Sequence, residues 1–287
     1  MTSTAVVETT GVTKIFRDFW NREKVAAVND LDLQVLPNEV YGLLGPNGSG
    51  KSTTVKMILG LLHPTRGQIR VLGEHPSNVA IKSRIGFLPE ESYLYPFLNA
   101  YETLDFYGRL FRQPRPARRK RVDMLLTMVG LANVAYRRVG EYSKGMQRRI
   151  GLAQALINDP DLLILDEPTS GLDPLGTRLF KDLIVDLGRR GKTVILCSHL
   201  LSDVEDVCDR VTILYGGRKR AEGDVSELLS QQERTQIVVE RLSESTLTAV
   251  RDVIAQRESK EILDVTHPRE KLEDLFLRIV AEAQAQR

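Results

Sequence analysis

Short apolar runs and longer amphipathic segments alternate along most of the chain. Leu31, Leu33 and Val35 alternate with polar residues, and a turn at Pro37 leads into a continuous apolar run. Such runs predict strands, and apolar residues three or four positions apart predict helices. Strands are expected twice within 28–45 and at 68–72, 84–88, 162–165, 194–197 and 211–214, and helices at 51–62, 175–190 and 200–208. This alternation predicts an α/β fold with a mainly parallel sheet.

Two segments depart from the alternation. Residues 91–158 keep helical spacing throughout, which predicts a helical subdomain inserted into the core. Beyond residue 222 the pattern predicts a small α+β unit, 223–287, without a glycine loop or a catalytic cluster. Its expected helices lie near 224–231 and 245–256 and from Glu270 onward, and its expected strands at 236–240 and 262–265.

Composition narrows the class of protein. Apolar residues make up 42% and charged residues 27%, which excludes a disordered or collagen-like chain. A net charge of +2 gives no overall attraction to nucleic acid or anionic lipid. Two cysteines are too few for a disulfide framework and indicate a reduced, intracellular protein. No signal peptide and no apolar run of about 18 residues is recognisable, so we expect any membrane role to come through a partner.

A glycine-rich loop stands between an apolar strand and a helix. Residues 45–52 read GPNGSGKS and match the phosphate-loop pattern GxxxxGK[ST]. Its backbone N–H groups can face a β-phosphate, Lys51 supplies a cation to the β- and γ-phosphates, and Ser52 offers a hydroxyl to Mg²⁺. The expected nucleotide-binding residues are Gly45, Pro46, Asn47, Gly48, Ser49, Gly50, Lys51, Ser52 and Thr53.

Two adjacent carboxylates follow the apolar run 162–165. Asp166 is suited to hold Mg²⁺, and Glu167 to polarise an attacking water. A buried strand that ends in an acidic turn would look the same by itself. Together with the phosphate loop, however, the pair indicates nucleotide hydrolysis.

Three further features narrow the kind of hydrolase. Ser143 stands at a capping position, and Gly145 leaves the following backbone open to an anion, although any capped helix has these properties. Residues 169–173 read TSGLD and follow the carboxylates directly. His199 follows the strand 194–198, where a lone histidine is more often structural.

Together these motifs resemble the ATP-binding cassette (ABC) family over about residues 6–222. By this resemblance YSKGMQ is a variant of the signature LSGGQ, Asp173 lies in the D-loop, and His199 is the switch histidine that contacts the γ-phosphate. Phe16 takes the place of the aromatic that stacks on adenine, with Phe19 and Trp20 as alternatives. The signature residues are Ser143, Lys144, Gly145, Met146 and Gln147.

The resemblance implies a phosphate-loop NTPase core with an N-terminal antiparallel β portion. It also implies ATP and Mg²⁺ as cofactors, and two subunits that close on two ATP molecules, with each signature contacting the other subunit's γ-phosphate. In transporters of the family this cycle drives a separate membrane permease, which would hold the chain at the cytoplasmic face of the membrane. Nothing in the sequence indicates the substrate.

One residue departs from the family pattern. Glu90 stands where the family usually has a glutamine that contacts Mg²⁺ and the lytic water. A carboxylate can serve as a metal ligand but adds negative charge near the γ-phosphate. Glu90 and the YSKGM signature both resemble the branch that serves ABC-2-type exporters.

Two surface features leave alternatives open. The apolar cluster 93–98 is either ordinary core or part of a docking groove for the permease. The basic run 112–121 is either a solvated helix face or a patch for lipid headgroups or nucleic acid. We weighed a soluble ABC ATPase acting on DNA or ribosomes as the alternative function. The spacing of the motifs, without heptads or cysteine modules between them, favours the transporter subunit.

Overall fold

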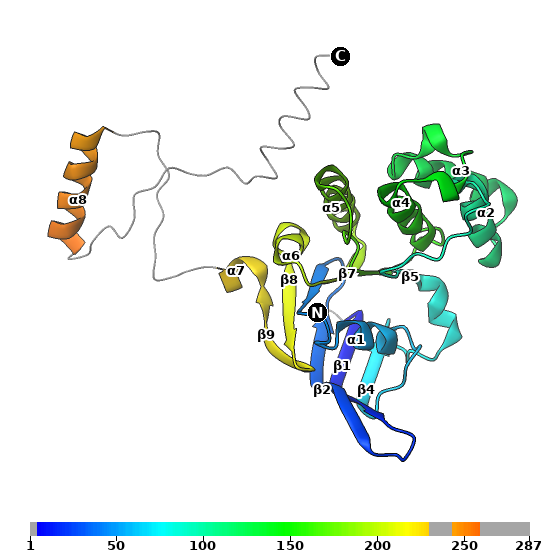
Figure 1. Cartoon of the computed structure of the whole chain (residues 1–287), viewed down its shortest axis with the longest axis horizontal. Helices are drawn as coiled ribbons and strands as arrows, with labels where there is room; N and C mark the ends of the chain where they lie inside the picture. The colour runs from blue at the N-terminus through cyan, green and yellow to red at the C-terminus, as the bar shows by residue number, and fades with distance from the viewer. Residues whose placement is uncertain (1–4, 230–242, 259–287) are drawn as a thin grey trace. The chain divides into compact units, whose positions relative to one another are not determined.

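The computed structural model describes residues 5–229 and 243–258 (Figure 1). The chain forms two compact units, Met1–Leu229 and Ser230–Arg287. The described part of the second unit contains α8 (Glu244–Glu258), where the sequence predicted a helix near 245–256. The predicted strands at 236–240 and 262–265 and the helix from Glu270 lie outside the described residues.

The first unit is built on a six-stranded sheet with the order β5-β6-β7-β3-β8-β9. Neighbouring strands from β5 to β8 are parallel, and β9 pairs antiparallel with β8, which confirms the mainly parallel sheet. The strands are β3 (Val40–Leu44), β5 (Ile85–Leu88), β6 (Leu162–Asp166), β7 (Thr193–Ser198), β8 (Arg210–Tyr215) and β9 (Arg218–Asp224). The apolar pattern did not predict β9, because this edge strand reads RKRAEGD and buries little.

A second, antiparallel sheet has the order β2-β1-β4. It confirms the expected N-terminal β portion and comprises β1 (Val7–Arg17), β2 (Glu23–Val35) and β4 (Arg66–Val71). Its inner face and α1 (Lys51–Ile58) cover one side of the large sheet. Helix α1 ends four residues before the predicted Leu62, because Gly60 adopts a positive φ of 67°.

The other side of the large sheet is covered by helices. These are α5 (Pro174–Arg189), α6 (Leu201–Val207) and the predicted helical subdomain, which contains α2 (Ala100–Leu110), α3 (Arg115–Met128) and α4 (Lys144–Ala155). Short 3₁₀ helices are η1 (Val79–Arg84), η2 (Ala132–Val134) and η3 (Val139–Glu141). Helix α7 (Val225–Leu229), which we expected to open the C-terminal unit, instead belongs to the first unit, and Val225 is buried there.

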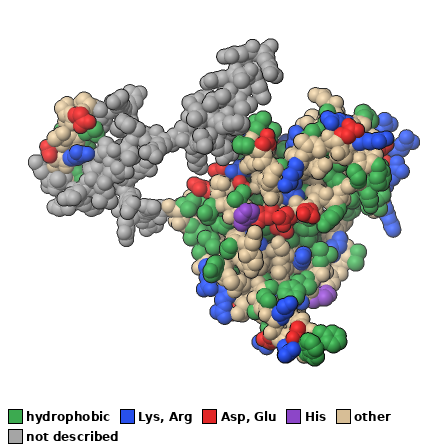
Figure 2. Space-filling model, in the orientation of Figure 1, with side chains coloured by type: hydrophobic (Ala, Val, Ile, Leu, Met, Phe, Trp, Pro, Cys, Tyr) green, Lys and Arg blue, Asp and Glu red, His purple; other side chains and the backbone are tan. Residues whose placement is uncertain are grey.

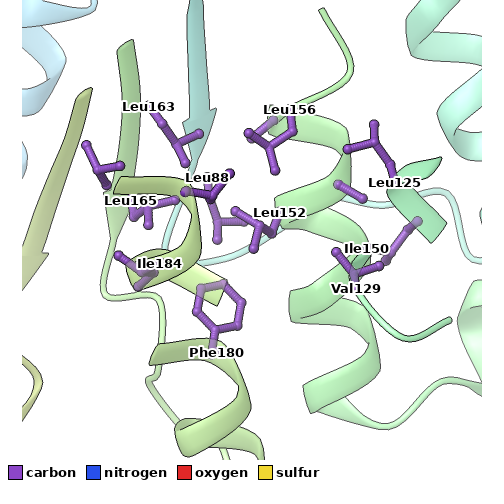
Figure 3. Close-up of a cluster of buried hydrophobic side chains, with 14 of the residues drawn as sticks. Leu88, Leu125, Val129, Ile150, Leu152, Leu156, Leu163, Leu165, Phe180 and Ile184 are labelled. Carbon is purple, nitrogen blue, oxygen red and sulfur yellow. The ribbon is translucent and has the colours of Figure 1, made fainter. Parts of the chain in front are cut away.

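The sheet separates two hydrophobic clusters because its strands are apolar on both faces. In β6, Leu163 and Leu165 pack toward the helices, whereas Leu162 and Ile164 pack toward α1 and the small sheet. The helical cluster joins β5, β6, α4 and α5 through residues that include Leu88, Leu152, Leu156, Leu165, Phe180 and Ile184 (Figure 3). Within residues 5–229 and 243–258, no helix is long and apolar enough to cross a membrane.

Candidate nucleotide-binding and catalytic site

The predicted motifs meet at one edge of the sheet. The phosphate loop follows β3, Glu167 follows β6 and His199 follows β7, and these strands are parallel neighbours in the order β6-β7-β3. Since the carboxyl ends of parallel strands share an edge, segments far apart in sequence converge there. Figure 2 shows acidic side chains and a histidine gathered side by side at the middle of the visible face.

The phosphate loop is held in a conformation that requires glycine. Gly48 and Gly50 have φ values of 79° and 106°, in the left-handed region. A Cβ on Gly50 would lie 2.5 Å from the carbonyl oxygen of Ala27. The Gly45 N–H donates to the Ser198 carbonyl (3.3 Å), which fixes the start of the loop beside β7.

Lys51 brings a buried cation to the carboxylate after β6. Its side chain is 5% exposed, its Nζ donates to the Gly45 carbonyl (2.6 Å), and it lies 3.6 Å from Glu167 Oε1. On the other side of Glu167, Oε2 lies 2.8 Å from His199 Nδ1. The carboxylate of Glu167 thus lies between a lysine and a histidine, beside the phosphate loop.

The backbone at Glu167 is strained, as is common at functional sites. Its φ is 46°, in the left-handed region that a glutamate rarely adopts. The Glu167 N–H donates to the Cys197 carbonyl (2.9 Å), which ties this residue to β7. The turn places its carboxylate beside Lys51 and His199 instead of continuing β6.

Asp166 offers the oxygen that a hard metal ion prefers. Its carboxyl group is buried, and its Oδ1 has no hydrogen-bond partner. Burial, followed by the charges of Glu167 and Glu90, raises the pKa of Asp166, while a hydrogen bond with Ser52 and the charge of Lys51 lower it. A divalent cation would relieve this concentration of negative charge, so Asp166 and Ser52 fit the predicted Mg²⁺.

Glu90 and Phe16 lie at the margins of this site. Glu90 follows β5 with an exposed side chain, close enough for its charge to raise the pKa of Asp166. Phe16 is 41% exposed and pairs with Val25, near Ala27, whose carbonyl lies against the phosphate loop. Phe19 and Trp20 lie farther along, in the turn that joins β1 and β2, which favours Phe16 as the adenine-stacking residue.

The signature and D-loop residues occupy two helix starts. Ser143 caps α4 by accepting from the Met146 N–H (3.3 Å), and Asp173 caps α5 by accepting from the Gly176 N–H (3.1 Å). Two amide hydrogen bonds hold Gln147 beside the 3₁₀ turn before α4. Among the described residues, no hydrogen bond or ion pair joins Ser143–Gln147 to the phosphate loop.

Comparison with known proteins agrees with this geometry. A family model described as ABC transporter matches residues 28–170. An uncharacterised ABC transporter ATP-binding protein of Synechocystis is 42% identical over 245 residues, which cover 84% of this chain and 69% of the relative. The chain belongs to the ATP-binding cassette transporter family. It is therefore an ABC ATPase subunit, as the sequence motifs predicted.

Other members carry more specific names. A Nod factor export ATP-binding protein of Burkholderia lata is 43% identical to this ABC ATPase over 75% of the chain and 73% of the relative. A solved dimeric ATP-binding cassette with ADP and Pi bound has a TM-score of 0.68 and 27% identity, over 76% of this chain and 98% of that one. CbiO1 of Clostridium perfringens, part of the transporter complex cbiONQ, has a TM-score of 0.72 and 25% identity, over 88% and 96%.

Sequence reasoning missed one residue of this ABC ATPase. Arg148 of α4 is buried, and its guanidinium donates to the carbonyl oxygens of five residues. They are Pro89, Glu90 (2.8 Å), Asp166 (2.6 Å), Glu167 (2.8 Å) and Pro168 (2.9 Å). Burial lowers the pKa of Arg148 to about 10, and the charges of Asp166, Glu90 and Glu167 oppose that shift, so the group stays charged at neutral pH.

Arg148 thereby connects the signature helix with the two loops that follow β5 and β6. An arginine can satisfy five carbonyl groups at once because its guanidinium carries five N–H donors in a fixed plane. The sequence did contain one sign of this role. Arg148 interrupts the apolar stripe of α4 between Leu152 and the signature. A basic residue in the second turn of a helix is common, however, so the signal was weak.

Proposed function

We propose that this ABC ATPase powers an exporter and works as a dimer bound to an ABC-2-type permease at the cytoplasmic face of the membrane. The observation that carries the catalytic assignment is the row formed by Lys51, Glu167 and His199, with contacts of 3.6 and 2.8 Å. Each of these side chains comes from a different strand end and has the chemistry that ATP hydrolysis needs.

Different residues bind ATP and catalyse its hydrolysis. The backbone of the phosphate loop and Lys51 bind the phosphates, and Phe16 stacks on the adenine. Glu167 accepts a proton from the attacking water, and His199 orients the Glu167 carboxylate and contacts the γ-phosphate. When bound, Mg²⁺ neutralises phosphate charge, and Ser52, Asp166 and Glu90 are the residues that would hold it.

The signature acts on the ATP of a second subunit in this proposal. Ser143 and Lys144 are exposed, and Gly145 leaves open backbone at the positive end of α4. These residues make no hydrogen bond or ion pair with the phosphate loop of their own chain, among the described residues, which supports a role across a subunit interface. We place Asp173 of the D-loop at the same interface. A dimeric cassette among the structural relatives is consistent with that arrangement.

An exposed aromatic surface favours a protein partner. Tyr93, Tyr95 and Phe97 are 84%, 45% and 67% exposed, which argues against ordinary core for most of the 93–98 cluster. Tyr95 contacts Phe97 and also Phe106 of α2 through ring pairs with centroids 5.7 and 5.9 Å apart. Clustered exposed aromatics are typical of protein interfaces, so we assign this surface to the permease. Relatives named for Nod factor export support the direction of transport.

The domain assignment extends this proposal. Residues 1–222 carry every proposed site, and the sequence pattern assigned 223–287 to an accessory unit. Helix α7 packs with the catalytic unit, so any separable accessory part begins after it.

Copurification tests the transporter role. The tagged full-length chain should bring down, from mild detergent, a membrane protein with about six apolar segments of about 20 residues. The double variant Tyr93→Asp/Phe97→Asp should lose that protein and keep its basal ATPase activity. Val79→Asp, which alters another highly exposed apolar residue, should keep both. Copurification of ribosomes or DNA in place of a membrane protein would contradict the proposal and favour the soluble alternative.

A further inference from the structure

An arginine-lined cavity on the helical subdomain is separate from every residue of the ATP site. It has a volume of about 700 Å³ and lies between α2, the start of α3 and the segment after η2. Its charged lining consists of Arg109, Arg115, Arg118 and Arg119 with one acid, Asp105. Figure 2 shows basic side chains along this outer part of the subdomain.

The cavity is held in shape by an ion-pair network around the half-buried Asp105. Asp105 accepts from Arg118 Nε and from Arg109 Nη2 (2.6 Å), and Arg118 also donates to the Gln113 carbonyl (2.8 Å). Burial alone would raise the pKa of Asp105, but hydrogen bonds from Arg118 and Arg109 bring it below its ordinary value, so the carboxylate stays charged. Gly108 allows the close approach, because a Cβ there would lie 2.6 Å from Arg118 Cδ.

Two arginines remain outside this network. Arg115 and Arg119 are exposed, and no ion pair within residues 5–229 and 243–258 includes either of them. Arg115 is the first residue of α3, where the helix dipole disfavours positive charge, and Arg119 lies one turn later on the same face of the helix. On a solvated helix face, the dipole would favour an acid at the position of Arg115. The arrangement therefore favours binding of an anion over stability of the helix.

A planar wall completes the cavity. Tyr101 and Tyr136 stack with ring centroids 5.8 Å apart and an interplanar angle of 20°. Tyr136 is 77% exposed, so burial alone does not explain its position. Phenolic hydroxyl groups are hydrogen-bond donors, and arginine forks match the oxygens of a phosphate. A cavity of this size lies in the range that holds small organic ligands.

We propose that this cavity binds the phosphate group of a small ligand or of a phospholipid head. Arg115 and Arg119 contact the phosphate oxygens, and Arg109 and Arg118 provide fixed positive charge. The two tyrosines line the part of the cavity that holds the group attached to the phosphate. None of the lining residues belongs to the proposed ATP site, so the test of this site does not depend on the proposed export function.

Binding to two phosphate probes tests the proposal and separates the two sources. The first probe is pyrophosphate, and its binding is measured by calorimetric titration. All chains in this titration carry Lys51→Ala, so that the phosphate loop contributes little to the measured binding. The second is cosedimentation with vesicles of phosphatidylglycerol and phosphatidylcholine, compared with phosphatidylcholine alone. The test variant is Arg115→Gln/Arg119→Gln. Its matched control, Arg112→Gln/Lys120→Gln, removes the same charge from the same segment but outside the cavity lining.

We expect the test variant to bind at least one probe about tenfold more weakly than the control does. A selective loss of pyrophosphate binding assigns a soluble phosphorylated ligand, and a selective loss of vesicle binding assigns a lipid headgroup. Equal losses in both variants would overturn the proposal, since they would reflect general electrostatics. The proposal would also be overturned if chains with an unaltered cavity bound neither probe. Unchanged basal ATPase activity in both variants, made without Lys51→Ala, will show that the chains are folded.

Discussion

The edge of the sheet and the outer surface of the helical subdomain use charged residues in opposite ways. At the sheet edge Lys51, Asp166 and Glu167 are almost fully buried, and backbone turns hold the two carboxylates in place. On the helical subdomain Arg115, Arg119 and the neighbouring Tyr136 are exposed. A buried charge is costly unless a partner or a ligand compensates it, so the buried charges favour the sheet edge as the functional site. The outer surface is available for partners and ligands.

Glu167→Gln should give the largest effect. The substitution keeps the shape of the side chain but removes its basicity, so ATP hydrolysis should fall by roughly 10²- to 10⁴-fold. ATP binding should survive, because Lys51, Ser52 and Asp166 are unchanged. Steady-state phosphate release with a parallel binding titration checks both parts. Normal hydrolysis by this variant would remove Glu167 from the catalytic role.

Lys51→Ala should weaken ATP binding by roughly 10- to 100-fold, since a charge-assisted hydrogen bond to phosphate is lost. Fluorescent nucleotide titration measures the change. Lys56→Ala, at the exposed end of the same helix, is the control and should bind normally. ATP affinity that survives Lys51→Ala unchanged would contradict the phosphate-loop assignment.

Arg148→Ala tests whether a buried charge outside the motifs supports them. Loss of its five hydrogen bonds should lower the free energy of unfolding by about 3–5 kcal/mol, because buried carbonyl groups lose their partner. Misplacement of Glu90 and Glu167 should also reduce kcat by about 10- to 100-fold, with a smaller change in KM. Denaturant unfolding and steady-state kinetics measure the two effects.

The neighbouring Arg149 provides the matched control. Its Nη1 donates to the Val129 carbonyl (3.0 Å), at the end of α3, and not to the loops after β5 and β6. Arg149→Ala should destabilise the chain less and leave kcat near the wild-type value. Equal kcat losses in the two variants would mean that Arg148 acts only through general stability.

The sequence could predict some elements of the fold and site but not others. The β3, β6 and β7 strands and the residues after them were predictable because strand periodicity and nucleotide chemistry both dictate residue types at set spacings. Strand β9 was not, since an exposed edge strand needs no apolar alternation. Arg148 was not, because its role depends on five carbonyl groups from two loops distant in sequence. Exposure of the 93–98 cluster likewise depends on tertiary packing.

Glu90 should show the smallest effect at the sheet edge, because its side chain is exposed. If its carboxylate contributes an oxygen to the metal, Glu90→Gln should keep substantial ATPase activity and Glu90→Ala should lose more of it. Comparing kcat of the two variants at saturating MgATP measures the difference. Near-wild-type rates in both would place Glu90 outside the site.

Size-exclusion chromatography with light scattering tests most directly whether the site is completed by a second subunit. Glu167→Gln with MgATP should run as a dimer that wild type does not retain, since ATP that binds but is not cleaved contributes contacts to both halves. Adding Ser143→Arg should return the chain to a monomer, because a bulky cation would block the contact between signature and γ-phosphate. A Glu167→Gln chain that stays monomeric with ATP bound, or a dimer that persists with Ser143→Arg, would contradict the account.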